Sequence, residues 1–198
     1  SGDGTFKVES ANLSEMLQKT IEDPSLVQQL GLSVRKIVID PGHGSKDPGA
    51  VSRFGKEKSI VLSLSKLLRD FLVNRGYDVH MTRETDEFIS LQNRPEFANV
   101  QEADLFLSIH VNASKNPKAS GIETYYLALA SDISASETAA RENIGANYTI
   151  QEFDLLVSKI LHESKSEESR RLAECVQSEL IYATGSVNRG VKHAPFVV

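Results

Sequence analysis

The stretch KIVIDPGHG, residues 36–44, is the part of the sequence that says most about the fold. It opens with a short β-branched run, KIVID, that is bounded by Pro41-Gly42, which predicts a buried strand. The glycine-rich residues 41–55 that follow predict a loop. His43 therefore lies directly after a strand, and open α/β sheets place their functional sites at the carboxyl ends of strands.

The sequence beyond this loop alternates between helical and strand-like patterns. Apolar residues recur at helical spacing from Ile60 to Leu72, and Gly76 is placed to end that helix. The other expected elements are strands at 77–82, 104–111 and 121–128, a short helix from Ser90 to about Val100, a helix at 167–184 ended by Gly185, and a final strand from about Phe196. This alternation predicts an α/β fold with a mostly parallel mixed sheet of about five to six strands and helices on both faces.

Two segments depart from the alternation. Residues 1–35 begin polar and irregular and then show a helical pattern, which predicts a lead-in helix or linker before the main domain at 36–198. Residues 130–165 contain an Ala-, Ser- and Glu-rich stretch and a second helical pattern, which predicts a helical insertion between strands. The last residues, from Pro195 on, read as the start of a strand, so we expect the domain to be incomplete at its C-terminal end.

The composition narrows the choice of function. The chain has 198 residues, 40% of them hydrophobic and 25% charged, and a net charge of −5. A negative chain without a basic stripe argues against nucleic acid as a partner. Cys175 is the single cysteine, so no internal disulfide forms, and its helical surroundings predict a small core residue. No apolar run reaches the roughly 20 residues that span a bilayer.

Three side chains on separate elements have the residue types of a catalytic metal site. His43 follows the first strand, His110 lies near the end of the strand at 104–111, and Glu57 begins the first long helix. Equivalent strand ends face one crevice, and the glycine loop can return the helix start to it. Two imidazoles and one carboxylate leave a fourth position open for water, which is the catalytic arrangement of zinc. Zinc lowers the pKa of that water to about 7 and polarises a carbonyl.

Each of these residues also has an ordinary structural explanation. A histidine after a glycine turn is usually structural or exposed, and a glutamate in a first helical turn often only compensates the helix dipole. The same ligand set can hold other divalent ions as well. The remaining histidines, His80, His162 and His193, are expected not to be ligands, since His80 is mid-strand and His162 lies beside polar sequence.

Several motifs follow one another along the chain with natural spacing: IVIDPGHGSKDPGA, FGKEKSIVLSLSKLL, YDVHMTRETDEFISLQNR, ADLFLSIHVNAS and GIETYYL. Over about residues 36–198 the sequence resembles the N-acetylmuramoyl-L-alanine amidase family of zinc cell-wall hydrolases. The resemblance implies that His43, Glu57 and His110 hold Zn²⁺. It also implies hydrolysis, by zinc-activated water, of the peptidoglycan amide between the lactyl group of N-acetylmuramic acid and the L-alanine of the stem peptide.

The resemblance further implies a second glutamate, on the last strand in a pattern like LVEVGF, that acts as general base and as proton donor to the leaving amine. The tail RGVKHAPFVV resembles the sequence that leads into this pattern. We therefore expect the catalytic glutamate beyond Val198 and assign no general base inside this chain. Glu123 is a substitute candidate, although a structural role at the sheet edge explains it better.

Four polar residues near the motifs are candidates for supporting roles. Asn112, which follows His110, is expected to orient substrate or support a ligand, or else to cap loop backbone. Asp40 is expected to support the loop that holds His43. Arg83 and Arg94 match family positions, and structural charge pairs explain them equally well.

The insertion at 130–165 resembles the extra helix of division-associated, autoinhibited members of this family. In those members the helix lies across the active site, and a glutamate caps the zinc until an activator protein removes it. The matching stretch here is ASETAAREN, in which Glu142 is the favoured capping residue and Glu137 the second choice. The alternative is a solvent-exposed helix with ordinary surface glutamates, which the composition alone favours.

Taken together, these features favour a monomeric amidase, periplasmic or otherwise extracytoplasmic, that cleaves septal peptidoglycan during daughter-cell separation. One alternative is a cell-wall binding or scaffold module without catalysis, which would fit a protein that lacks the terminal glutamate. Another is a zinc hydrolase with a different target, such as a peptidase or a deacetylase, because motif loops do not show the substrate directly.

Overall fold

The computed structural model describes residues 34–112, 119–129, 131–146 and 166–197. The chain divides into two compact units, Ser1–Val34 and Arg35–Val198. The predicted lead-in helix lies outside the described residues, as does the part of the predicted insertion from 147 to 165. Both stay predictions, and the fold below is that of the second unit.

A parallel three-stranded sheet carries the site. β1 (Lys36–Pro41) lies between β4 (Asp78–Met81) and β5 (Leu105–Ile109), and both neighbours run parallel to it. Strands on both sides and a helix packed on its face bury β1 almost completely, as its β-branched sequence predicts. The carboxyl ends of β1 and β5 meet at one edge, since Pro41 pairs with Ile109.

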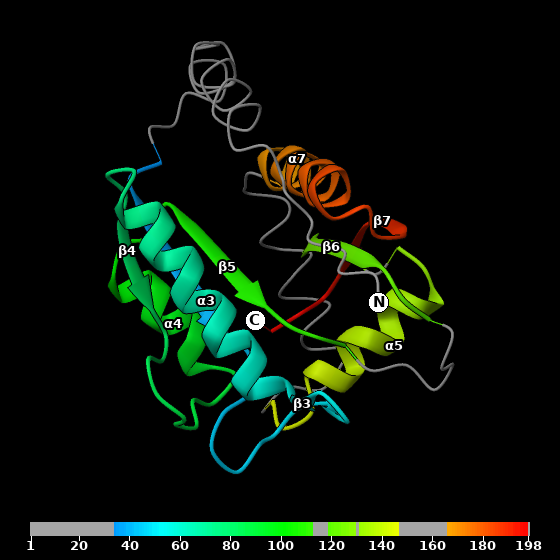
Figure 1. Cartoon of the computed structure of the whole chain (residues 1–198), viewed down its shortest axis with the longest axis horizontal. Coiled ribbons are helices and arrows are strands. Elements are labelled where there is room, and N and C mark those ends of the chain that lie inside the picture. Colours follow the sequence, from blue (N-terminus) through cyan, green and yellow to red (C-terminus); the bar gives the residue numbers. More distant parts are fainter. Residues whose placement is uncertain (1–33, 113–118, 130, 147–165, 198) are drawn as a thin grey trace, which may run out of the picture. The chain divides into compact units, whose positions relative to one another are not determined.

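Helix α3 (Glu57–Val73) packs against β1 and β4 (Figure 1). Its buried positions, Glu57, Val61 and Ser65, recur every four residues and form the stripe that faces the sheet. The predicted apolar face is therefore covered only in part, and several of its members remain exposed, among them Leu64, Leu67 and Phe71. This orientation turns the first residue of the helix toward the sheet edge.

Two short elements flank the loop after β1. β2 (Val51–Ser52) and β3 (Gly55–Lys56) form an antiparallel hairpin inside the segment predicted as loop, and they are too short to show an alternating pattern. α4 (Asn93–Val100) is the predicted short helix, although it begins at Asn93 and not at Ser90. Ser90 still lies at its start, where its Oγ accepts a hydrogen bond from the Asn93 N–H.

A second group of elements packs around a pair of parallel strands. β6 (Ile122–Leu127) pairs with β7 (Asn188–Ala194), and α7 (Ser166–Thr184) packs against both. Helix α5 (Ile133–Glu142), the described part of the insertion, packs against β7.

Three further expectations differ from the structure. The final strand begins at Asn188 and not near Phe196, because its sequence NRGVKHA is polar and partly exposed and gives little apolar signal. The prediction for Cys175 is wrong, since this residue lies on the exposed side of α7 while Ala173 and Gln177 are buried. The α/β class with parallel strands is confirmed, but the described strands hydrogen-bond in three groups, β4-β1-β5, β2-β3 and β6-β7.

Among the described residues, no helix is both long and apolar enough to cross a membrane.

Candidate metal centre

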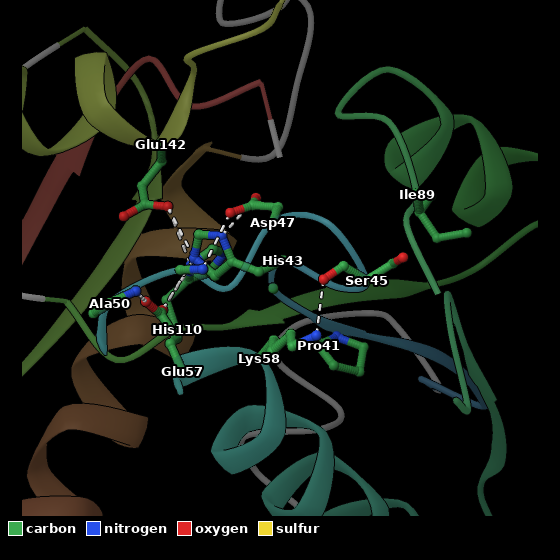
Figure 2. A network of polar contacts seen from close by, with 12 residues as sticks. Pro41, His43, Ser45, Asp47, Ala50, Glu57, Lys58, Ile89, His110 and Glu142 are labelled. Carbon is green, nitrogen blue, oxygen red and sulfur yellow. Dashed lines mark hydrogen bonds and ion pairs between the residues drawn. The ribbon is translucent and has the colours of Figure 1, made fainter. Parts of the chain in front are cut away.

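Three side chains from three elements converge at the edge of the sheet where β1 and β5 end. His43 lies in the loop after β1, Glu57 is the first residue of α3, and His110 directly follows β5. One nitrogen or oxygen atom from each of the three lies within 4.8 Å of the others (Figure 2). These are the three residues predicted as ligands, and we call this group the metal centre.

A single carboxylate oxygen bridges the two histidines. Glu57 Oε1 lies 3.3 Å from His43 Nε2 and 3.2 Å from His110 Nδ1. The two imidazole rings are 4.9 Å apart and meet nearly edge to face, at 76°. The lone pairs of two nitrogens and one oxygen are thus gathered into a volume that a single ion can fill.

The metal centre passes a direct test of whether its residues fit a cation. Within the described residues, His43 Nε2 and His110 Nδ1 are buried and lack a hydrogen-bond partner of acceptable geometry, despite the oxygens close by. Buried polar atoms without a partner are rare and call for a specific explanation. Two imidazole nitrogens and one carboxylate oxygen are the donor set of catalytic zinc sites, so a bound zinc ion would supply that explanation.

The electrostatics of the site favour a positive charge at its centre. Burial alone would raise the pKa of Glu57, but the two histidine side chains beside it and hydrogen bonds from two backbone N–H groups hold this pKa far below its usual range. Burial lowers the pKa of His110, yet the carboxylates of Glu142 and Glu57 outweigh it and raise this pKa to about 9. Glu57 and Asp47 likewise raise the pKa of His43 against the effect of burial. Negative charge that stabilises protons here would also stabilise a divalent cation.

Backbone contacts fix the orientation of Glu57. Its Oε2 accepts a hydrogen bond from the Ala50 N–H at 2.8 Å, and its Oε1 accepts one from the Val111 N–H at 2.6 Å. The first contact comes from the loop before α3 and the second from the residue after His110. The carboxylate therefore joins the two loops that carry the histidines.

Asp47 contacts the metal centre, and sequence reasoning missed it. Its Oδ2 lies 2.9 Å from His43 Nδ1, so it binds the ring nitrogen that faces away from the metal centre (Figure 2). Its Oδ1 accepts a hydrogen bond from the Gly49 N–H, which holds the carboxylate in place. A carboxylate on the outer nitrogen fixes the tautomer of a metal-binding histidine and raises its basicity. The sequence signal for this contact was the spacing between His43 and Asp47 in the stretch HGSKD.

Two glycines allow the ligands to approach so closely. A Cβ at Gly42 would lie 2.4 Å from His110 Cε1, and a Cβ at Gly49 would lie 2.5 Å from His43 Cδ2 and 2.7 Å from Glu57 Oε2. Gly49 also has φ +63°, a conformation that disfavours other residues. The glycines of the DPGHG and DPGA motifs thus leave the space that the ligand side chains occupy.

Two buried arginines hydrogen-bond to the backbone of the loop that carries His43. Arg83 donates hydrogen bonds to the carbonyls of Pro41 and Gly42, and Arg94 donates to those of Pro41 and His43. His43 itself has φ 60°, an unfavourable value for a residue other than glycine, which these contacts help to hold. Both arginines therefore have structural roles beneath the site.

Asp40, the residue expected to support this loop, lies fully buried under it. Its carboxylate accepts hydrogen bonds from Thr82, from Arg94 at 2.8 Å and from Ser108. These partners come from the end of β4, from α4 and from β5, so one carboxylate connects the elements around the end of β1. Among the described partners of its carboxylate, Arg94 is the one that also bonds to the carbonyl of His43.

Glu142, at the end of α5, reaches the same histidines from the opposite side. Its Oε2 lies 3.2 Å from His110 Nδ1 and 3.6 Å from His43 Nε2, and its side chain is 20% exposed (Figure 2). Glu137, the second choice for the capping residue, is exposed, and only its backbone carbonyl has a described contact, with Arg141. The structure therefore separates the two candidates by their contacts.

Other sequence candidates lie outside the metal centre. Asn112 is exposed and follows Val111, and its proposed role toward substrate stays a prediction. The Glu123 carboxylate accepts hydrogen bonds from Tyr125, Arg189 and Lys192, which identifies a structural role between β6 and β7 and leaves it poorly suited as a base. Of the remaining histidines, His80 pairs with Asp78 and His193 bonds to the Leu129 carbonyl, while His162 lies outside the described residues.

Comparison with known proteins identifies the family. A family model described as N-acetylmuramoyl-L-alanine amidase matches residues 37–198. The chain belongs to the N-acetylmuramoyl-L-alanine amidase family. The matched residues include every member of the metal centre and the whole of α5.

Several amidases resemble the chain in sequence or in structure. It is 36% identical over 176 residues to the amidase AmiA of Escherichia coli K12, across 83% of this chain and 60% of that protein. A crystal structure of an amidase from Clostridium difficile 630 aligns with a TM-score of 0.59 and 28% identity, over 82% of this chain and 70% of that one. Amidase AmiC2 of Nostoc punctiforme gives a TM-score of 0.58, also at 28% identity, over 83% and 71%. The chain thus spans about 60% of the length of its AmiA relative.

Proposed function

We propose that this domain is a zinc-dependent N-acetylmuramoyl-L-alanine amidase, which hydrolyses the amide between the lactyl group of N-acetylmuramic acid and the L-alanine of peptidoglycan stem peptides. The observation that carries the proposal is the metal centre: two buried imidazole nitrogens without hydrogen-bond partners, gathered around one ionised carboxylate. The family and the names of the relatives indicate the substrate.

The residues at the site would have separate roles in the reaction. His43, Glu57 and His110 hold the ion, and Asp47 keeps the proton of His43 on Nδ1 so that Nε2 is free to bind. Bound zinc supplies Lewis-acid chemistry, polarising a carbonyl and acidifying water enough for attack near neutral pH. The general base is the glutamate that the family resemblance implies, which is expected beyond Val198. Because Glu57 is held by two backbone N–H groups, it serves as a ligand and not as a mobile base.

The activity is tested with the zinc-loaded protein that includes the glutamate expected beyond Val198, which is incubated with purified peptidoglycan before the products are identified. We expect free muramic acid lactyl carboxyls and new L-alanine amino termini, and a Glu57→Gln variant should abolish their release. Glu96→Gln is the matched control, since Glu96 is also an acidic residue in a first helical turn but is exposed and lies outside the metal centre. Products from a cut inside the peptide, or loss of an acetyl group, would instead identify a peptidase or a deacetylase.

We further propose that Glu142 makes the enzyme autoinhibited. Its carboxylate lies against the same two nitrogens that face the ion, so it would take the fourth position that water needs. An off state populated to about 99% requires a preference of only roughly 3 kcal/mol. One charged contact of this kind, together with the packing of α5, is of that order.

The comparison of Glu142→Gln with Glu137→Gln tests this regulation. Both residues lie on α5 and both changes remove one negative charge, but only Glu142 contacts the metal centre. We expect Glu142→Gln to increase peptidoglycan hydrolysis and Glu137→Gln to leave it unchanged. Equal rates in both variants and the wild type would reject the inhibitory role of Glu142.

An enzyme of this kind would act outside the cytoplasm, where peptidoglycan lies, and would need a partner that displaces α5. One relative, the CwlD amidase of Clostridioides difficile, has been solved in complex with the lipoprotein GerS, at a TM-score of 0.59 and 25% identity to this chain over 83% of this chain and 74% of that one. We propose an activator protein for this chain on that precedent, and a role in daughter-cell separation. Loss of the gene should leave cells joined at their septa, and normally separated cells would contradict this role.

A further inference from the structure

We propose that Asn143 is the positioning residue that holds Glu142 against the metal centre, because it clamps the end of α5 to the segment Pro195–Val197 that follows β7. The inference rests on the proposed inhibitory role of Glu142 and adds the device that keeps it in place. It also names the part of the chain against which the inhibitory helix is held.

Helix α5 contributes only small side chains to its own packing. The buried residues of the helix are Ala135, Thr138 and Ala139, and the two alanines form a small cluster with Ala194, against which Tyr125 and Phe196 pack. Small side chains bury little apolar area and interdigitate little, so they resist sliding or lifting of a helix less than large ones do. Ile133, which begins the helix, and Ile144, which follows its C-cap, are 80% and 78% exposed and add little burial.

Asn143 supplies the specific contact that the alanines lack. Its Nδ2 donates a hydrogen bond to the Pro195 carbonyl at 2.8 Å, and its Oδ1 accepts one from the Val197 N–H at 2.9 Å. The carbonyl can only accept and the N–H can only donate, so a single orientation of the amide satisfies both. The Phe196 N–H bonds to the Ala194 carbonyl, which makes a tight turn around Pro195 and shapes the segment that the amide grips.

The clamp acts on the residue next to the proposed inhibitory carboxylate. Asn143 is the C-cap of α5 and directly follows Glu142. Helix ends fray, so the last residues of an otherwise lightly packed helix depend on contacts made by the cap. Fixing Asn143 to Pro195–Val197 therefore restricts the backbone of Glu142, whose carboxylate must stay within reach of both histidines.

The substitution Asn143→Asp tests the clamp with almost no change of shape. The aspartate still accepts from the Val197 N–H, but it places an oxygen where the amide nitrogen donated to Pro195. One hydrogen bond is lost and two acceptors face each other. Asn74→Asp is the matched control, because Asn74 is the exposed C-cap of α3 and the change adds the same charge at the same helix position.

The measurement is the affinity of acetohydroxamate, a small metal ligand, for the Co²⁺-loaded chain, followed by visible absorption. Acetohydroxamate needs the position that Glu142 covers, so its apparent Kd equals the intrinsic Kd divided by the fraction of open chain. We expect Asn143→Asp to tighten the apparent Kd about tenfold, from the loss of one hydrogen bond and the new repulsion. Glu142→Gln should tighten it at least as much, and Asn74→Asp should not change it.

The possible outcomes distinguish failure of the Asn143 clamp from failure of the proposed inhibitory role of Glu142. If Glu142→Gln tightens binding while Asn143→Asp does not, the clamp is rejected and the inhibitory carboxylate stands. If neither variant tightens binding, the inhibitory role of Glu142 falls and the clamp falls with it. In a chain that already carries Glu142→Gln, adding Asn143→Asp should have no further effect, which a general loss of structure would not reproduce. Should Asn143→Asp fail to fold by circular dichroism, Asn143→Ala is judged by the same criteria.

Discussion

Two regions flank the metal centre, the loop with His43 and helix α5, and they are held in place in opposite ways. The loop with His43 rests on Arg83, Arg94 and Asp40, which are buried, charged and hydrogen-bonded to several elements at once. Helix α5, which carries Glu142, is held by alanines that pack against Tyr125 and Phe196 and by the side chain of Asn143. Both regions border the two histidine nitrogens of the metal centre.

This difference assigns each side a task. Buried charge networks are costly to rearrange, because any movement leaves charges unpaired, so the ligand side is preformed and stays in place. Within the described part of the chain, helix α5 carries no buried charge network, so its displacement should cost less free energy than movement of the loop with His43. We therefore propose a rigid site with a removable cover, and the following predictions test that contrast from the largest effect to the smallest.

The largest effect should come from Asp40→Ala. This change leaves the buried guanidinium of Arg94 without its carboxylate, and breaking a buried ion pair costs about 3–5 kcal/mol. We expect a loss of this size in the free energy of unfolding, measured with denaturant. Asp70→Ala is the control, since Asp70 pairs with Arg69 at the surface and should cost under about 1 kcal/mol. Similar losses in both variants would show that the network under the loop is not rigid.

The second largest effect should come from zinc binding, which should raise the free energy of unfolding. Zinc at about 100 times its Kd should raise the free energy of unfolding by about 2.7 kcal/mol, because only the folded chain gathers the ligands. A rise in Tm on zinc addition, reversed by EDTA, checks this. His110→Ala should remove the response, and a full response in that variant would place the zinc elsewhere.

Asp47→Asn should weaken zinc binding by about 10–100-fold, since the carboxylate on the outer nitrogen of His43 orients the ring and raises its basicity. Competition with a chromophoric chelator measures the affinity. Asp78→Asn is the matched control, because Asp78 pairs with His80 outside the metal centre. An unchanged zinc affinity in Asp47→Asn would remove Asp47 from the functional residues.

The smallest effect should come from Asp132→Ala at the start of α5. Asp132 accepts a hydrogen bond from the Ala135 N–H as the helix N-cap, and losing such a cap costs about 1 kcal/mol. Hydrogen exchange of the α5 amides should accelerate about fivefold, while exchange in β1 stays slow. Equal acceleration in both elements would mean that α5 opens only with the whole domain, and not as a separate cover.

The sequence predicts the parts of this molecule whose signals are local. The β-branched run of β1 and the apolar repeat of α3 indicated their elements, and residue type together with strand-end position selected His43, Glu57 and His110. The hairpin of β2 and β3 was too short for such a pattern. The polar strand β7 was missed because the apolar segment after it gave the stronger signal.

The supporting contacts could not be predicted in the same way. Asp47 precedes Pro48-Gly49, so it reads as an ordinary turn residue until its contact with His43 is seen. The Asn143 side chain meets backbone groups that lie far along the chain, and no spacing rule connects a helix cap to a distant turn. Such pairings arise from packing in three dimensions.

The most direct test of the account is the zinc content of the purified, metal-replete chain, measured by elemental analysis after dialysis. The account predicts one zinc ion for each wild-type chain and none in variants with His43→Ala, Glu57→Ala or His110→Ala, each checked for folding by circular dichroism. A folded wild-type chain without zinc, or variants that keep the full complement, would contradict the claim that these three side chains form a metal centre.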